Sequence, residues 1–246
     1  MRLVTVLVLA GTREGREIAA GLATRGMPVL ASLAGRTRRP LDPGVPVRSG
    51  GFDGEAGFRA ALDEHGITAV IDATHPFAET ITGRTARICC EIGLPHLILR
   101  RPGWTPAPGD DWTRIKAEAD LAAHVPRGKT VFLATGPQRL EAFSGLEDRR
   151  VLCRRIDPAP GPFPHEDGQW VVSRPPFSAD DEMALFALMG VDVLAAKDSG
   201  GEDGRAKLEA ARRLGLKVVL LDRPPLPDGA QVVETVEAAL QWAEDL

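Results

Sequence analysis

The chain has 246 residues, 43% of them hydrophobic and 26% charged, and its formal net charge at pH 7 is −4. This length allows one large or two small globular domains, each with a buried core. Because basic residues are not in surplus, we expect no nucleic acid partner. No apolar run approaches the roughly 20 residues that cross a bilayer, so we expect a soluble protein with no membrane partner.

The three cysteines, Cys89, Cys90 and Cys153, show none of the paired spacings of a zinc site. We therefore expect no metal centre, and we expect small buried thiols in a reducing compartment, the cytoplasm. The chain contains no tyrosine, which excludes the Tyr-Lys proton relay of short-chain reductases.

An apolar run from Val4 to Ala10 predicts a first strand that is buried on both faces. Gly11, Thr12 and Arg13 follow at once, and the helix formers behind them predict a helix over residues 14 to 25. Such a turn directs unpaired backbone N–H groups and the positive end of the helix dipole at one spot, which suits a phosphate. Since the full Gly-x-Gly-x-x-Gly fingerprint is absent, a turn that binds no ligand remains the alternative.

A basic segment, Gly35-Arg36-Thr37-Arg38-Arg39, follows the second predicted strand over residues 28 to 33. Residues 1 to 50 hold eight arginines against three acidic residues. The order strand, helix, strand predicts a right-handed parallel unit, in which this segment lies beside the adenosine ribose of a dinucleotide. An acidic residue there favours NAD, whereas arginines favour the 2′-phosphate of NADP. A solvated basic loop is the alternative.

A histidine lies at the tip of a further buried strand, predicted over residues 68 to 73 and followed by Thr74-His75-Pro76-Phe77-Ala78. Because the carboxyl ends of parallel strands meet at one edge, we expect His75 to face the same crevice as Gly11. A contact with cofactor or substrate, a proton transfer and a structural role all stay open for His75. The other elements predicted here are a weak strand over 43–47, helices over 53–65 and 79–91, and a strand over 95–99.

The character of the chain changes at residues 100 to 109, which are irregular, basic and rich in proline. We interpret this segment as a crossover between two domains, residues 1–98 and 99–246. Trp104 in the crossover is either a partly exposed aromatic residue at the cleft between the domains or a hydrophobic peg that holds them together.

The second half repeats the alternation of strands and helices. Two of its turns resemble the opening one, because Thr135-Gly136 and Lys197 to Gly201 both place flexible backbone at the start of a helix. Three such turns favour a cleft for an anionic, multidentate ligand, although each turn could simply be tight. The elements predicted here are strands over 129–134, 150–155, 191–196 and 217–221, and helices over 138–143, 178–189, 203–214 and 232–244.

Four stretches together resemble the precorrin-6A reductase family of cobalamin biosynthesis: Leu9 to Gly15, Asp72 to Ala78, Thr135-Gly136 and Lys197 to Gly201. They occur in the family's order, and the similarity continues to Arg223-Pro224. The resemblance implies an α/β fold of two Rossmann-like domains with mainly parallel sheets and an active site in the cleft between them. It also implies reduction of one double bond in the precorrin macrocycle by a pyridine nucleotide, in the cytoplasm.

Site residues follow from the resemblance and from the turns. We predict that NADPH contacts Gly11, Thr12, Arg13, Glu14, Ser32, Gly35, Arg36, Thr37, His75 and Phe77. We predict that the tetrapyrrole substrate contacts Arg101, Trp104, Thr135, Gly136, Lys197, Ser199, Gly200 and Gly201. His75 is the best-placed group for a catalytic proton transfer, although solvent is an alternative donor. We expect a monomer or a weak homodimer.

Two other functions compete with this one. A methyltransferase that uses S-adenosylmethionine also has a glycine turn after its first strand, but it usually requires an acidic residue after the second, where this chain has Ser32 and then arginines. A non-catalytic NADP sensor needs the first unit but has no use for the turn from Lys197 to Gly201.

Overall fold

The computed structural model describes residues 4–35 and 43–246, and the chain forms two compact units. The first unit ends at Pro102 but also takes in Pro224–Leu246, and the second is Gly103–Arg223. The predicted second domain, residues 99–246, therefore includes a carboxyl-terminal segment that belongs to the first unit. The cause is strand pairing, because β12 (Gln231–Val233) adds to β5 (His96–Leu99) of the first unit.

The first unit contains a sheet of six parallel strands in the order β12-β5-β4-β1-β2-β3. The central strand β1 is fully buried, which explains its unbroken apolar run. In its register, Leu9 lies opposite Ser32 on one side and Asp72 on the other. The strands not yet given are β1 (Val6–Ala10), β2 (Val29–Leu33), β3 (Val47–Ser49) and β4 (Ala69–Ala73).

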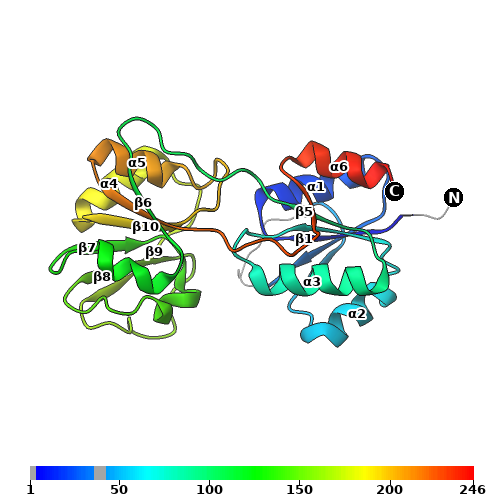
Figure 1. Cartoon of the computed structure of the whole chain (residues 1–246), viewed down its shortest axis with the longest axis horizontal. Helices are drawn as coiled ribbons and strands as arrows, with labels where there is room; N and C mark the ends of the chain where they lie inside the picture. The colour runs from blue at the N-terminus through cyan, green and yellow to red at the C-terminus, as the bar shows by residue number, and fades with distance from the viewer. Residues whose placement is uncertain (1–3, 36–42) are drawn as a thin grey trace. The chain divides into compact units, whose positions relative to one another are not determined.

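Helices cover both faces of this sheet, with α1 and α6 on one face and α2 and α3 on the other (Figure 1). The side chains of β1 alternate between the two layers: Val6 and Val8 pack with the α1 and α6 core, and Leu7 and Leu9 with the α2 and α3 core. The helices are α1 (Arg13–Thr24), α2 (Gly54–Glu64), α3 (Glu79–Ile92) and α6 (Val236–Glu244).

The second unit has its own sheet of six parallel strands, in the order β6-β11-β10-β7-β8-β9. Helices α4 (Ala179–Met189) and α5 (Ala206–Leu214) pack side by side on one face (Figure 1). The helix predicted over 138–143 is a 3₁₀ helix, η2 (Pro137–Ala142), and a second one, η1, covers Glu118–His124. The strands are β6 (Asp111–Ile115), β7 (Thr130–Leu133), β8 (Arg150–Arg155), β9 (Gly168–Val172), β10 (Val193–Lys197) and β11 (Lys217–Leu221).

Both sheets have the Rossmann strand order 3-2-1-4-5-6, if β1 and β7 each count as strand 1. The sixth place belongs to β12, from the end of the chain, in the first unit, and to β6, which precedes strand 1, in the second. This arrangement confirms the predicted α/β class with two Rossmann-like sheets. It also fixes two switch points, between β1 and β4 and between β7 and β10, where ligands bind in such folds. Across residues 4–35 and 43–246, no helix has the length and apolar content to cross a membrane.

Candidate functional site

The turn after β1 is fixed by one hydroxyl group. Thr12 caps α1, and its Oγ1 accepts a hydrogen bond from the Gly15 N–H at 3.1 Å. The same oxygen donates to the Ala73 carbonyl at the end of β4, at 2.8 Å. The hydroxyl therefore ties together the two strands at the switch point. Because its single proton is used in this bond, only the backbone N–H of Thr12 is left to donate to a phosphate.

Two glycines shape the space around this turn. A Cβ atom at Gly11 would have no atom within 4 Å, whereas one at Gly15 would lie 3.1 Å from the Ala10 Cα and 3.3 Å from the Ala73 Cβ. Gly15 lets the helix pack closely on the strands, and Gly11 leaves the backbone open to an approaching group. These are two of the glycine functions in dinucleotide-binding turns, so the residues present fit a pyrophosphate at the amino end of α1.

Two residues predicted for different ligands form a pair beside this turn. Arg101 Nη1 lies 2.7 Å from Glu14 Oε2, and both side chains are largely buried at 16% and 15% exposure. Arg13 interacts along the helix, with its Nε 3.3 Å from Glu17 Oε1. Arg101 thus belongs to the first unit, where it neutralises a carboxylate in the first turn of α1.

The predicted adenosine end is partly described by the structure. Ser32 is buried on β2 and lies opposite Leu9 and Arg48 in the neighbouring strands. Gly35 has a φ of +69°, and a Cβ there would lie 3.4 Å from the Gly50 N atom, so the loops after β2 and β3 meet backbone to backbone. Arg36 and Thr37 lie outside the described residues.

The segment after β4 folds into a tight turn with its histidine at the edge of the sheet. Asp72, which is 1% exposed, accepts the Thr74 N–H at 3.0 Å through Oδ1. His75 is half-buried, and its Nδ1 accepts the Phe77 N–H at 3.3 Å. The rings of His75 and Phe77 lie 5.7 Å apart. Because Nδ1 is an acceptor here, the neutral imidazole carries its proton on Nε2.

Three titratable residues near this turn, Asp72, Cys89 and His96, are buried or half-buried. The second carboxylate oxygen of Asp72 has no hydrogen-bond partner in the part of the chain that the structure describes. Burial, together with the Asp72 charge, raises the pKa of the Cys89 thiol to about 12. Burial lowers the pKa of His96, an effect that Asp72 opposes. The Cys89 thiol therefore stays protonated at neutral pH and is no nucleophile.

The second switch point presents an unpaired hydroxyl beside an open glycine. Thr135 is 9% exposed, and its Oγ1 has no partner among the described residues. Gly136 has a φ of +79°, and a Cβ there would meet nothing within 4 Å. The sheet pairs Leu133 with Ala195, so Thr135 and Lys197 leave the ends of neighbouring strands. These groups fit a polar ligand at the carboxyl edge of the second sheet.

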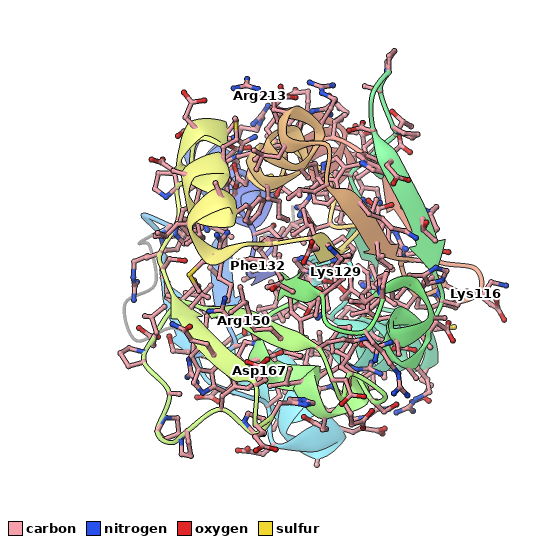
Figure 2. All side chains as sticks on the ribbon, turned by 90° about the vertical axis from the view of Figure 1, so that its left-hand side faces the viewer. Lys116, Lys129, Phe132, Arg150, Asp167 and Arg213 are labelled. Atoms are coloured by element: carbon pink, nitrogen blue, oxygen red, sulfur yellow. The ribbon has the colours of Figure 1, made fainter. Side chains whose placement is uncertain are left out.

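At the amino-terminal edge of this sheet, charged side chains already bond to other groups of the protein. Figure 2 shows Lys129, Arg150 and Asp167 at the amino-terminal ends of β7, β8 and β9. Lys129 Nζ lies 2.9 Å from Asp192 Oδ1, and Arg150 donates to the Met189 carbonyl. The carboxyl edge is therefore the better candidate for ligand binding in this unit.

Asp198, which the sequence analysis did not assign to the site, fixes the turn from Lys197 to Gly201. It is 2% exposed, and its carboxylate accepts the Trp104 N–H at 3.0 Å and Arg114 Nη2 at 2.6 Å. Its carbonyl oxygen accepts Arg223 Nε at 2.7 Å. These partners are distant in sequence, so no local pattern singles out the residue.

Trp104 is 5% exposed and belongs to the core of the second unit. Its Nε1 donates to the Gly201 carbonyl at 2.8 Å, and a Cβ at Gly204 would lie 2.7 Å from its ring. This burial favours the buried alternative for Trp104 and leaves little surface of the ring for the predicted substrate contact. The indole instead supports the turn that contains Gly200 and Gly201.

Buried charges under the same turn also escaped the sequence analysis. Lys207 donates to the Gly204 carbonyl at 2.8 Å, and its ammonium lies 5.3 Å from the Trp104 ring. Burial lowers the pKa of Lys207 to about 8, with Glu182 opposing and Arg154 adding to the shift. Arg154 and Glu182 form two bonds of 2.6 Å. In sequence these residues cannot be told from ordinary surface charges.

Comparison with known proteins identifies the group to which the fold and the turns belong. The family model of the precorrin-6x reductases CbiJ/CobK matches residues 5–244. The chain belongs to the precorrin-6x reductase family. A precorrin-6A reductase from Rhodococcus erythropolis is 41% identical over 99% of both chains. The solved structure of a CobK precorrin-6A reductase has a TM-score of 0.92, with 38% identity over 98% of this chain and 96% of that one.

The chain is also similar to relatives of lower identity. A cobalt-precorrin-6A reductase from Synechocystis is 27% identical over 98% of this chain and 97% of its own length. Family membership makes the chain an oxidoreductase of cobalamin biosynthesis.

Proposed function

We propose that this chain reduces one double bond of precorrin-6A to give precorrin-6B, with NADPH as the hydride donor. The observation that carries the proposal is the open Gly11 turn on the Thr12-capped helix, at the first switch point of a chain in this reductase family. When bound, NADPH supplies the hydride, so the work of the protein is to bind and orient the two molecules.

The first unit holds the nucleotide in this proposal. The backbone N–H groups of Gly11, Thr12, Arg13 and Glu14 bind the pyrophosphate at the start of α1. Arg101 neutralises Glu14, whose carboxylate would otherwise repel that phosphate. We therefore assign Arg101 to the nucleotide side instead of to the substrate. The adenosine end goes to Ser32, Gly35, Arg36 and Thr37, next to the loop after β3.

His75 and Phe77 lie in the turn that follows β4, the strand that adjoins β1, and the nicotinamide of a dinucleotide lies near this edge in such folds. Reduction of a carbon–carbon double bond needs a proton at the carbon next to the one that receives the hydride. His75 Nε2–H is the group that we assign to this transfer, because Nδ1 is occupied by the Phe77 N–H.

The second unit anchors the substrate in this proposal. Precorrin-6A carries several carboxylates, and Lys197 supplies a cation at the carboxyl edge of the sheet. Ser199, Gly200 and Gly201 form the turn that follows, and Gly136 leaves its backbone accessible. The buried Thr135 hydroxyl lacks a partner in the described chain, and a substrate carboxylate would satisfy it.

We infer that the natural substrate ring carries no cobalt. The support is the identity to relatives, which is 37% to 41% for those named precorrin-6A reductase and 26% to 27% for those named cobalt-precorrin-6A reductase. We further propose a monomer or weak homodimer that works in the cytoplasm, where a reducing environment suits its free cysteines.

An anaerobic assay with purified protein tests the function. NADPH oxidation at 340 nm, together with the loss of precorrin-6A absorbance and a product two mass units heavier, is the expected result. NADH and cobalt-precorrin-6A should react more slowly. Methylation of the ring by S-adenosylmethionine without NADPH oxidation would favour a methyltransferase, and tight NADPH binding without turnover would favour a sensor; either result rejects the reductase assignment.

A further inference from the structure

The loop after β3 lies beside the predicted adenosine site and was not assigned to it. β3 ends at Ser49, and Gly50 then donates its N–H to the Leu33 carbonyl at the end of β2, at 2.9 Å. Gly50 and Gly54 adopt φ values of +107° and +87°. The backbone of this loop therefore continues the surface that Gly35 begins.

Arg48 lies on β3, and the loop that follows holds its guanidinium group in place. Its guanidinium carbon lies 3.9 Å from the centre of the Phe52 ring. Nη1 donates to the Gly50 carbonyl at 3.0 Å, and Nη2 donates to the Gly51 carbonyl at 2.5 Å. Each of these nitrogens carries two hydrogens, so one N–H on each and the Nε–H remain after these bonds. The side chain thus has a fixed plane and unused donors.

A second arginine lies at the same ring. Arg84 on α3 has its guanidinium carbon 5.6 Å from the Phe52 centre and donates to the Gly54 carbonyl at 3.3 Å. Its Nε is buried and has no partner among the described residues. Burial and the nearby Arg48 lower the pKa of Arg84, while Glu55 opposes this shift. Each guanidinium group therefore raises the electrostatic free-energy cost of keeping the other one charged.

Neither cation is neutralised by an ion pair within residues 4–35 and 43–246. Glu55, the acidic residue that acts on Arg84, is instead ion-paired with Arg87. Two guanidinium groups on one aromatic ring that lack an ion pair in the described part of the chain, with glycine backbone around them, are the features of a phosphate site.

We propose that Arg48 binds the 2′-phosphate of the adenosine half of NADPH, with Arg84 adding positive charge at the same ring. The assignment rests on the proposed function, because it presumes that the nucleotide lies at the first switch point. Arg48 lies on β3 opposite Ser32 of β2, and Gly35 follows β2, so the phosphate lies at the ends of two neighbouring strands whose following loops already touch. Arg48 is then a residue that selects NADPH over NADH.

Calorimetric titration of the full chain with NADPH, NADH, 2′-AMP and 5′-AMP tests the assignment. Wild-type protein should prefer NADPH and 2′-AMP. Arg48→Gln should weaken NADPH binding about tenfold to a hundredfold, because one charge-assisted contact is lost, and should leave NADH affinity unchanged. Arg84→Gln should weaken NADPH binding about two- to fivefold. Arg59→Gln is the matched control, since Arg59 on the neighbouring helix α2 is ion-paired with Glu91.

The possible failures are distinguishable. If wild-type protein prefers NADPH and Arg48→Gln keeps that preference, this inference is wrong and the proposed function stands. If wild-type protein binds neither dinucleotide, both this inference and the proposed function are wrong. A loss of NADH and NADPH affinity to the same degree would show that Arg48 only shapes the loop, which also overturns the inference. Unchanged NADH affinity in Arg48→Gln is the internal check that the loop remains folded.

Discussion

The hydroxyl of Thr12 donates to the Ala73 carbonyl at 2.8 Å and so joins the carboxyl ends of β1 and β4. The same hydroxyl caps α1. Thr12→Val keeps the shape but removes both bonds, so we expect a loss of roughly 1 to 3 kcal/mol in the free energy of unfolding and weaker NADPH binding. Thr12→Ser keeps the hydroxyl and should retain most of the stability and of the NADPH binding. Urea denaturation and nucleotide titration measure these effects, and equal behaviour of the two variants would contradict the assignment.

Gly11 and Gly15 lie four residues apart but should respond in opposite ways to alanine. At Gly15 the added methyl would meet the Ala10 backbone at 3.1 Å, so we expect a loss of about 1 to 3 kcal/mol from overpacking. At Gly11 it enters open space, so stability should stay within about 0.5 kcal/mol of wild type while NADPH affinity falls. Melting curves and nucleotide titration separate the two outcomes. A Gly11→Ala protein with normal affinity would show that no phosphate approaches this turn.

Asp198 joins the Gly103-Trp104 segment, Arg114 and Arg223 at the turn that we assign to the substrate. Asp198→Asn leaves Arg114 with a weaker partner, and we expect a loss of roughly 2 to 4 kcal/mol in stability together with a higher KM for the precorrin. NADPH affinity should not change, because the nucleotide site lies in the first unit. The control is Asp180→Asn on α4, whose carboxylate is 86% exposed. A normal KM in a folded Asp198→Asn protein would remove the positioning role.

The sequence predicted the centres of both sheets better than their edges. Strands such as β1 and β4 are buried on both faces, so their composition alone identifies them. The edge strands β6 and β9 were missed because Asp111, Arg114 and Gln169 interrupt the apolar pattern. Residues 232 and 233 were assigned to the closing helix, but with Gln231 they form β12 and pair with β5, a partner more than 130 positions away. No pattern of neighbouring residues predicts such a contact.

In the candidate site, too, the sequence predicted features with a local signal and missed those that depend on distant residues. The turns at Gly11, Thr135 and Lys197 were found because glycine after an apolar strand is a local signal. The role of Asp198 and the proposed role of Arg48 depend on residues from other loops and strands, so no local pattern pointed to them. The burial of Trp104 stayed open because the sequence does not reveal which side of a crossover is buried. Local chemistry predicts turns, whereas charge pairing and burial emerge only when distant segments meet.

His75→Ala should slow turnover while leaving the fold intact. The side chain is half-buried and packs on Phe77 within its own turn, so the expected stability loss is small. If Nε2–H delivers the proton, kcat should fall about 10²- to 10⁴-fold, with NADPH affinity little changed. Steady-state kinetics in H₂O and D₂O make the distinction. An unchanged kcat, with the same solvent isotope effect as wild type, would assign the proton to water.

Lys207 gives the second unit a stability that depends on pH. The pKa of its ammonium is about 8 in the folded chain against an ordinary 10.5, so between these values the unfolded chain binds more protons than the folded one. Stability therefore rises with pH across that window and is lowest, for this group, below pH 8. Lys207→Met should remove this rise and increase stability at pH 7 by roughly 1 to 3 kcal/mol. Urea denaturation at pH 7, 8, 9 and 10 checks both effects. Lys116→Met, at an exposed position (Figure 2), is the control, and a parallel pH dependence in wild type and Lys207→Met would show that this ammonium is not desolvated.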